Sequence, residues 1–204
     1  MRKLVYFISL TLDGFIAGPG DEVDFFNGSA DYMQRMMADY TDLLPHQARE
    51  HLGLADAPLT RFDTVVMGRR TYDPALQLGV ASPYSHLRQI VFSRSLASTN
   101  PQVLVTDSDP VATIRGFKGE DSRLDIYLAG GGQLAAVLLS EIDELIIKRY
   151  PVVIGSGVPA FDRKFAPAHF SVVENVVFES GNSITRFKPL AQAGPAGNSP
   201  GEMA

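Results

Sequence analysis

Short apolar runs alternate with segments of helical periodicity along most of the chain, and this alternation most limits the folds open to it. Strands that alternate with helices are typical of an α/β domain with a largely parallel sheet. The last two runs are separated only by Ser180-Gly181-Asn182, which predicts an antiparallel hairpin and therefore a mixed sheet. The predicted strands cover residues 4–10, 64–67, 89–92, 103–105, 126–129, 144–148, 171–179 and 183–187.

Helical patterns fall between these runs. In the last of them, Leu134, Val137 and Leu138 share one face and are expected to pack on the sheet. Residues 18–61 contain no clear strand and are interpreted as an insertion or a lid on the substrate side. The predicted helices cover residues 32–44, 71–75, 110–116 and 133–139.

The length and composition fit one large globular domain or two small ones. Hydrophobic residues make up 45% of the 204 residues and charged residues 20%, and a chain of this size buries roughly 70% of its unfolded surface without covalent staples. Residues 191–204 are rich in Ala, Gly and Pro and are predicted to form a disordered tail. Because Cys is absent and the four His residues (46, 51, 86 and 169) follow no metal-ligand spacing, we expect neither a thiol nucleophile nor a metal site.

Acidic residues exceed basic ones, 23 against 18, which gives a formal net charge of −5. Nucleic-acid binding needs clustered basic residues, and the longest cluster here is Arg69-Arg70, so no nucleic-acid partner is expected. The apolar N-terminal run is broken by Ser9 and Thr11 too early for a secretory signal, and no apolar window is long enough to span a membrane. We therefore expect a cytoplasmic protein with no membrane partner.

Residues 64–71 predict a phosphate-binding turn. An apolar strand ends at Gly68, Arg69 and Arg70 follow, and a helix is expected to begin at or just after Thr71, which is also a candidate cap. A helix start offers unpaired backbone N–H groups and the positive end of a dipole, and guanidinium groups add charge-assisted hydrogen bonds. The alternative is a simple chain reversal at Gly68 with two solvated arginines.

A second strand end has the same design. Ser93, Arg94 and Ser95 follow the strand at 89–92, so hydroxyl groups lie beside a cation that suits a phosphate monoester. Polar residues are ordinary at strand ends, and a solvent-facing arginine is the alternative interpretation.

A third strand end carries Gly130, Gly131 and Gly132 between a strand and a helix. Glycines let the backbone approach a pyrophosphate closely. The acidic residue that a Rossmann domain needs about 20 residues later is missing, since Lys148 and Arg149 occupy that region, so a phosphate turn is predicted without Rossmann topology. Three such turns at one sheet edge suit a ligand with several phosphates, and NADPH matches this set better than NADH.

Five motifs occur in the order found in the dihydrofolate-reductase-like superfamily, and together they span roughly residues 1–190. Within that superfamily the chain most resembles the branch that includes the reductase domain of the bifunctional riboflavin-biosynthesis protein. The zinc deaminase half of that protein requires cysteine ligands, which this chain lacks. The motifs lie at residues 9–17 (SLTLDGFIA), 66–72 (VMGRRTY), 92–95 (FSRS), 129–132 (AGGG) and 151–161 (PVVIGSGVPAF).

The resemblance implies a three-layer α/β fold with a mixed, mainly parallel central sheet, flanking helices and a C-terminal antiparallel hairpin, with NADPH across the strand ends. It also implies a mobile first loop that closes over the nicotinamide. Together with the turns described above, it predicts cofactor contacts from Ile16, Ala17, Gly68, Arg69, Arg70, Thr71, Ser93, Arg94, Ser95, Ala129, Gly130, Gly131, Gly132, Gln133 and Leu134.

The resemblance also implies a substrate-binding carboxylate on the first helix. Asp31 and Asp24 are the candidate catalytic residues, and Asp39 is a further choice. Asp31 falls at a predicted helix start, where Asp is often only a cap. Asp13 lies in an Asp-Gly turn and is expected to shape the first loop.

The implied function is an NADPH-dependent reductase that transfers hydride to a pterin- or pyrimidine-like small molecule. The nearest named reaction is reduction of 5-amino-6-(5-phosphoribosylamino)uracil in riboflavin biosynthesis. A dihydrofolate reductase proper is an alternative, although the Trp of its usual first loop is absent here. A non-catalytic NADPH or pterin binder is another alternative. A third hypothesis is a homodimer formed through residues 151–161, and the competing interpretation of that segment is a loop buried within one chain.

Overall fold

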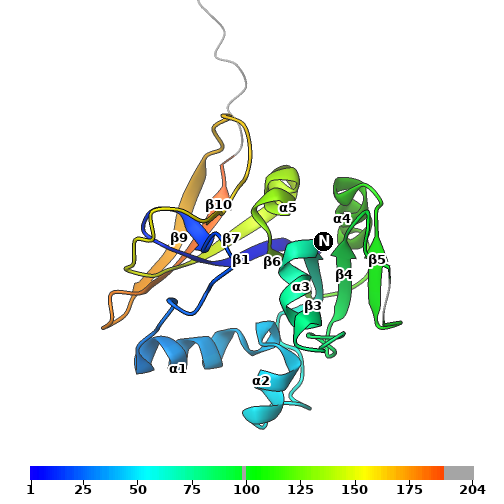
Figure 1. Ribbon diagram of the computed structural model, residues 1–204, viewed down its shortest axis with the longest axis horizontal. Coiled ribbons are helices and arrows are strands. Elements are labelled where there is room, and N and C mark those ends of the chain that lie inside the picture. Colours follow the sequence, from blue (N-terminus) through cyan, green and yellow to red (C-terminus); the bar gives the residue numbers. More distant parts are fainter. Residues whose placement is uncertain (98–99, 191–204) are drawn as a thin grey trace, which may run out of the picture.

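The computed structural model describes residues 1–97 and 100–190. Eight strands form one sheet in the order β5-β4-β3-β6-β1-β7-β10-β9, and two short strands, β2 and β8, form a second sheet (Figure 1). The strands are β1 (Leu4–Leu10), β2 (Phe15–Ala17), β3 (Phe62–Gly68), β4 (Arg88–Phe92), β5 (Val103–Thr106), β6 (Asp125–Gly130), β7 (Ile142–Arg149), β8 (Val158–Pro159), β9 (Phe170–Val177) and β10 (Ser183–Pro189).

Strands β1 and β3 to β7 run parallel, and β10 adds to β7 in the antiparallel direction before pairing with β9. The mixed sheet and the C-terminal hairpin at Ser180-Gly181-Asn182 are therefore confirmed. Gly181 has a φ of +81°, which a glycine adopts without steric cost and which the tight turn requires. The tail predicted for residues 191–204 lies outside the described residues.

Helices cover both faces of the sheet, which gives three layers (Figure 1). Val5, Phe7 and Tyr127 face a core closed by residues of α1 and α3, while Tyr6 and Leu128 face a core closed by α4 and α5. This arrangement follows from strands that are apolar on both faces, as buried parallel strands are. The helices are α1 (Ala30–Asp39), α2 (His46–His51), α3 (Arg69–Gln77), α4 (Pro110–Lys118) and α5 (Gly132–Val137), with 3-10 turns η1 (Thr41–Leu43) and η2 (Leu139–Glu141).

Several element boundaries differ from the sequence-based expectations. The helix predicted at 32–44 ends at Asp39, because Tyr40 has a φ of −132° and leaves the helical conformation. Helix α3 begins at Arg69 instead of Thr71, and its N-cap residue is Gly68, so the prediction that Thr71 caps it is wrong. The strands β2 and β8 and the helix α2 were not predicted, because each is too short to show a periodic pattern.

The predicted packing of the 133–139 segment is only partly right. Leu134 and Leu138 are buried, but Val137 is 53% exposed, so its prediction as a core residue is wrong. The physical reason is that α5 is only six residues long and ends at Val137, so that the chain enters a 3-10 turn instead of completing the predicted helical face.

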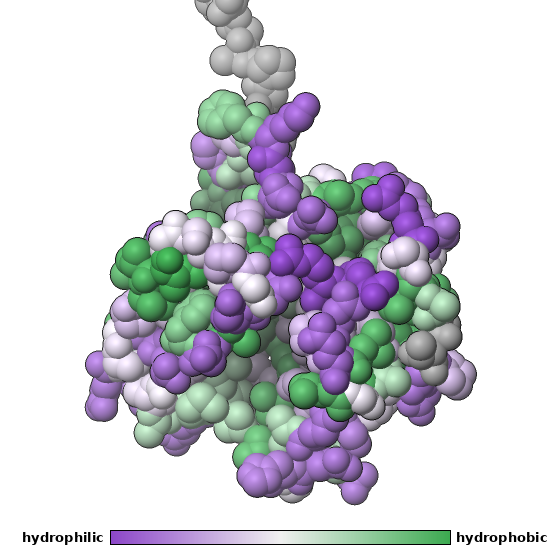
Figure 2. All heavy atoms as spheres, viewed as in Figure 1, coloured by the Kyte–Doolittle hydropathy of each residue, from purple (hydrophilic) through white to green (hydrophobic). Residues whose placement is uncertain are grey.

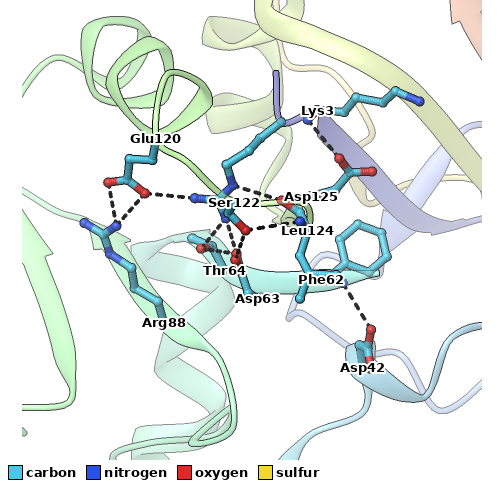
Figure 3. A network of polar contacts seen from close by, with 11 residues as sticks. Lys3, Asp42, Phe62, Asp63, Thr64, Arg88, Glu120, Ser122, Leu124 and Asp125 are labelled. Atoms are coloured by element: carbon cyan, nitrogen blue, oxygen red, sulfur yellow. Dashed lines mark hydrogen bonds and ion pairs between the residues drawn. The ribbon is translucent and has the colours of Figure 1, made fainter. Parts of the chain in front are cut away.

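A polar network fixes the N-terminus at the amino ends of the strands (Figure 3). The buried guanidinium of Arg2 donates to the carboxylates of Asp63 and Glu120 and to the carbonyl oxygen of Leu124. Glu120 also pairs with Arg88 at 2.8 Å. This network joins β1, β3, β4 and the loop before β6 at the opposite ends of the strands from the cavity described below.

In the described part of the chain, none of the helices has the length and apolar character needed to cross a bilayer.

Candidate functional site

A cavity of about 1110 Å³ lies at the carboxyl ends of the parallel strands. Its walls include the ends of β1, β3, β4, β5, β6 and β7 and the residues that follow them. Ligands of open α/β sheets bind at this edge, where the loops after the strands converge. The volume is at the upper end of the ~300–1,000 Å³ typical of small-molecule sites, which leaves room for a large ligand. Figure 2 shows that the face of the molecule drawn there is hollowed near its centre.

The first predicted turn opens into this cavity. Gly68, Arg69, Arg70 and Thr71 all line it, and no side chain caps the start of α3. Because the helix begins two residues earlier than expected, both arginines belong to its first turn. Each is paired with a carboxylate, Arg69 with Asp73 of the same helix and Arg70 with Asp21 at 2.6 Å.

The glycine turn after β6 lies directly beside the first turn. Gly130 and Gly131 have φ angles of +140° and +94°, which side-chain-bearing residues rarely adopt. The hydroxyl oxygen of Thr71 lies 3.4 Å from where a Cβ on Gly131 would be. The fold therefore places the Thr71 hydroxyl at the backbone of the glycine turn and joins two predicted phosphate turns into one surface.

The third turn follows β4 and forms another part of the cavity wall. The hydroxyl oxygen of Ser93 accepts hydrogen bonds from the backbone N–H groups of Ser95 and Leu96, so it holds the turn. Arg94 is exposed, and within the described residues its guanidinium makes no ion pair. Arg94 is therefore the cation of the three turns whose charge is free for a ligand.

The short sheet of β2 and β8 covers the other side of the cavity. Ile16 and Ala17 of β2 line it, and Gly157 lets β8 approach, because a Cβ there would lie 2.2 Å from the carbonyl oxygen of Ala17. The carboxylate of Asp13 accepts hydrogen bonds from the backbone N–H groups of Ile154 and Gly155, at 3.2 and 2.7 Å. Asp13 thus shapes the first loop, as predicted. Its hydrogen bonds also mean that part of the 151–161 segment makes contacts within its own chain.

The predicted cofactor residues form one set in space: every one of them lines the cavity, although they come from four separate parts of the sequence. They are Ile16, Ala17, Gly68, Arg69, Arg70, Thr71, Ser93, Arg94, Ser95, Ala129, Gly130, Gly131, Gly132, Gln133 and Leu134.

The candidate catalytic carboxylates lie elsewhere. Asp31 and Asp24 are not among the described residues that line the cavity. Asp31 accepts hydrogen bonds from the Ser29 hydroxyl and from the backbone N–H groups of Tyr32 and Glu179, the last at 3.0 Å. The Ser29 hydroxyl and the Glu179 N–H lower the pKa of Asp31. The geometry therefore gives Asp31 the role of fastening α1 to the β9–β10 hairpin.

Sequence reasoning missed the inner part of the cavity. Phe7, Phe26, Tyr127 and Lys148 line it, and the Lys148 ammonium lies 4.3 Å from the centroid of the Phe7 ring. The available signal was a lysine inside the apolar strand Ile146-Ile147-Lys148, where a charged side chain needs a reason to be present. Burial lowers the pKa of Lys148 to about 8.

Two partly buried histidines, His46 and His86, also lie close together, although they are 40 residues apart in sequence. The rings of His46 and His86 stack with centroids 6.5 Å apart, and a ring nitrogen of His86 lies 2.9 Å from the carbonyl oxygen of Asp42. Burial lowers the pKa of His86, which favours the neutral ring. Neither ring lines the cavity, so this pair has a structural role in the region of η1 and α2.

Solved structures share this fold at low sequence identity. A protein of Shewanella sp. PV-4, described as a riboflavin biosynthesis protein, matches with a TM-score of 0.62 and 23% identity, over 93% of this chain and 100% of that one. A deaminase/5-amino-6-(5-phosphoribosylamino)uracil reductase of Thermotoga maritima matches at 0.62 and 16%, over 93% and 57%. RibD of Acinetobacter baumannii matches at 0.61 and 16%, over 93% and 58%. The protein has the dihydrofolate-reductase-like fold of these structures.

Sequence comparison identifies the family. The chain is 31% identical over 165 residues to the uncharacterized protein YwjB of Bacillus subtilis, which covers 78% of this chain and 83% of YwjB. It is 24% identical over 193 residues to the uncharacterized protein YyaP of the same organism, over 88% and 91%. The chain belongs to the family of YwjB. A scan against models of known protein families finds no match.

Proposed function

We propose that the protein is an NADPH-dependent reductase of a pterin- or pyrimidine-like heterocycle. The observation that carries this proposal is the convergence of all the predicted cofactor residues on one cavity at the carboxyl ends of the parallel strands. The Thermotoga protein with the same fold is named as a deaminase/5-amino-6-(5-phosphoribosylamino)uracil reductase, and this name supports a reductase.

The donors that line the cavity fit a ligand with phosphates at two separated places. The uncapped start of α3 and the Gly130-Gly131 turn provide backbone groups for a pyrophosphate. Arg94 and Ser95, on the turn after β4, provide a separate cation and hydroxyl for a phosphate monoester such as the 2′-phosphate of NADPH. A site with both a pyrophosphate subsite and a separate monoester subsite suits NADPH better than NADH, because NADH has no 2′-phosphate.

The remaining walls give the substrate its place. When bound, NADPH supplies a hydride from C4 of its nicotinamide ring. Ile16, Ala17 and Ala129 add apolar surface to the cavity wall, and Phe7, Phe26 and Tyr127 add aromatic surface to its inner part. The role of the chain is to hold the nicotinamide and the substrate ring in contact and away from water. This positioning is how the protein accelerates the hydride transfer.

Thermal unfolding with NADPH, with NADH and without ligand tests the proposal. A ligand at 100 times its dissociation constant adds about 2.7 kcal/mol to the free energy of unfolding. We expect a clear rise in Tm with NADPH and a much smaller one with NADH, followed by NADPH oxidation in a screen of pterins and pyrimidines. No shift with either nucleotide would contradict the proposal, and a shift without oxidation of NADPH by any heterocycle would favour a non-catalytic binder.

A further inference from the structure

Lys148 is a cation without a matching anion in the inner part of the cavity. It lies at the carboxyl end of β7, paired in register with Ser9 of β1, and its ammonium rests against the face of the Phe7 ring. Within residues 1–97 and 100–190, Lys148 takes part in no ion pair, and desolvation alone accounts for its lowered pKa. A partly buried ammonium without a carboxylate is unfavourable unless another group supplies the missing charge.

The acidic side chains of Glu144, on this face of β7, and of Asp21, in the cavity wall, form ion pairs with arginines and not with Lys148. Glu144, on the same face of β7, is buried and is bound by Arg61 at 3.0 Å and Arg186 at 2.9 Å. Asp21 at the cavity wall pairs with Arg70. No carboxylate of the described residues compensates Lys148, so this end of the cavity has a net positive charge.

The side chains around Lys148 are suited to a flat ring. Phe7, Phe26 and Tyr127 all line the cavity, and the Phe26 ring is held 4.6 Å from the ring of Tyr150, measured between centroids. Ser9 adds a hydroxyl group at the same depth of the sheet as Lys148. Aromatic side chains that share a cavity wall with one cation and one hydroxyl group suit a planar ring with an oxygen at its edge.

We propose that Lys148 binds an oxyanion on the edge of a planar heterocycle, so that the substrate class of this cavity is anionic rings, such as ionised pyrimidinediones, and not protonated ones. This inference rests on the proposed function for the nature of the second ligand. A carboxylate on the first helix would instead favour a protonated ring, and the candidates Asp24 and Asp31 do not line this cavity.

Other ionisable groups on the same face of the sheet do not replace Lys148. Arg186 of β10 is held by Glu144 and Glu174, and burial raises the pKa values of Tyr32 and Tyr40, which keeps both phenols neutral. Strand β1 contributes only Phe7 and Ser9 at this depth. Arg94 lines another part of the same cavity, so it is the loss of the preference in a Lys148 variant, and not the preference alone, that assigns the preference to Lys148.

The test compares two probes of nearly the same shape, barbiturate, which is ionised at neutral pH, and uracil, which is neutral. Calorimetric titrations are made with and without saturating NADP⁺. We expect the wild-type protein to bind barbiturate at least tenfold more tightly than uracil, Lys148→Met to lose that preference, and Lys148→Arg to keep part of it. Lys164→Met, at an exposed lysine outside the cavity wall, is the matched control and is expected to behave as wild type.

Two readouts separate this inference from the proposed function. NADPH binding, followed by thermal shift, is expected to be equal in wild type and all three variants. If NADPH shifts none of them, the proposed function fails, while the nucleotide-free titrations still decide the role of Lys148. Equal binding of the two probes by wild type, absence of barbiturate binding, or an unchanged preference in Lys148→Met overturns the inference.

A pH series on the wild-type protein removes any dependence on folding of the variants. The preference for barbiturate is expected to fall as pH rises through about 8, since Lys148 loses its charge there while barbiturate stays ionised. A preference that is constant from pH 6.5 to 8.5, a range in which uracil stays neutral, would also overturn the inference.

Discussion

Arg70 and Asp21 form an ion pair, 2.6 Å between Nη2 and Oδ1, that joins the first turn of α3 to the segment after β2 beside the cavity. Both side chains are substantially exposed, at 59% and 42%. Exposed pairs of this kind contribute only about 0–1 kcal/mol to stability. The pair therefore matters less for folding than for the availability of the Arg70 guanidinium to a ligand.

Replacement of Asp21 by Asn is expected to tighten NADPH binding about two- to fivefold, because Arg70 no longer has to exchange one anion for another. Asn is a suitable replacement, since Asp21 has a φ of +67° and Asn tolerates this conformation. Fluorescence titration with NADPH measures the change. Weaker binding by Asp21→Asn would show instead that the ion pair positions the 18–26 segment over the ligand.

Arg94→Gln is expected to weaken NADPH binding by about tenfold to a hundredfold, as loss of a charge-assisted hydrogen bond costs about 1.5–3 kcal/mol. NADH binding is expected to change little, because NADH has no 2′-phosphate. The matched control is Arg123→Gln, an exposed arginine away from the cavity wall. An equal loss for both nucleotides would place Arg94 at another part of the ligand.

Gly132→Ala is expected to destabilise the protein by about 1–3 kcal/mol, the usual range for forced overpacking. A Cβ at Gly132 would lie 2.1 Å from the carbonyl oxygen of Pro159, and a backbone atom cannot move aside as a side chain can. Gly116→Ala in α4 is the control: nothing lies within 4 Å of its Cβ position, and a gain of roughly 0.5–1 kcal/mol is expected there. Urea unfolding compares the two variants.

Asp31→Asn is expected to reduce stability near neutral pH and to flatten its dependence on pH in acid. The folded-state pKa of Asp31 is lowered by Ser29 and by the Glu179 N–H, so its stabilisation is present above the ordinary Asp pKa and is lost as pH falls through the lowered value. Thermal unfolding between pH 2.5 and 7 measures this. Because Asp31 lies outside the cavity wall, NADPH affinity is expected to stay unchanged, and a large loss of it would return Asp31 to the site.

Lys148→Met is expected to change the pH dependence of stability at alkaline pH, whereas Asp31→Asn changes it in acid. The pKa of Lys148 is lowered to about 8 in the folded protein, so the unfolded chain binds more protons between pH 8 and its ordinary pKa, and wild-type stability gains with rising pH there. Relative to wild type, Lys148→Met should therefore be most stable below pH 8 and lose this advantage towards pH 10. A constant difference across this range would mean that Lys148 has an ordinary pKa.

The main strands and the three turns that line the cavity could be predicted from local sequence. The first five residues of β1, 4–8, are all apolar or aromatic because parallel strands are covered on both faces. Gly68, Arg94 and Gly130-Gly131 were recognised because a glycine or a basic residue follows a strand in each case, although a simple turn or a solvated arginine fits the same local pattern. Since the carboxyl ends of parallel strands share one sheet edge, the prediction that these turns meet needed no further information.

Other features depended on neighbours that are distant in sequence. The role of Asp31 was decided by the Glu179 N–H, 148 residues away, which takes up its second oxygen. The short strands β2 and β8 exist because each pairs with the other, since neither has a periodic pattern of its own.

The sequence by itself determined the sheet, the hairpin and the chemistry of the turns, because these depend on residue types at adjacent positions. Only the tertiary structure decided which charges remain without a partner. Arg70 and Glu144 are neutralised by Asp21 and Arg186, whereas Lys148 has no ion-pair partner among the described residues and lies against the Phe7 ring. Charge compensation is a sum over everything within a few ångströms in space, and a sequence does not contain those distances until the chain is folded.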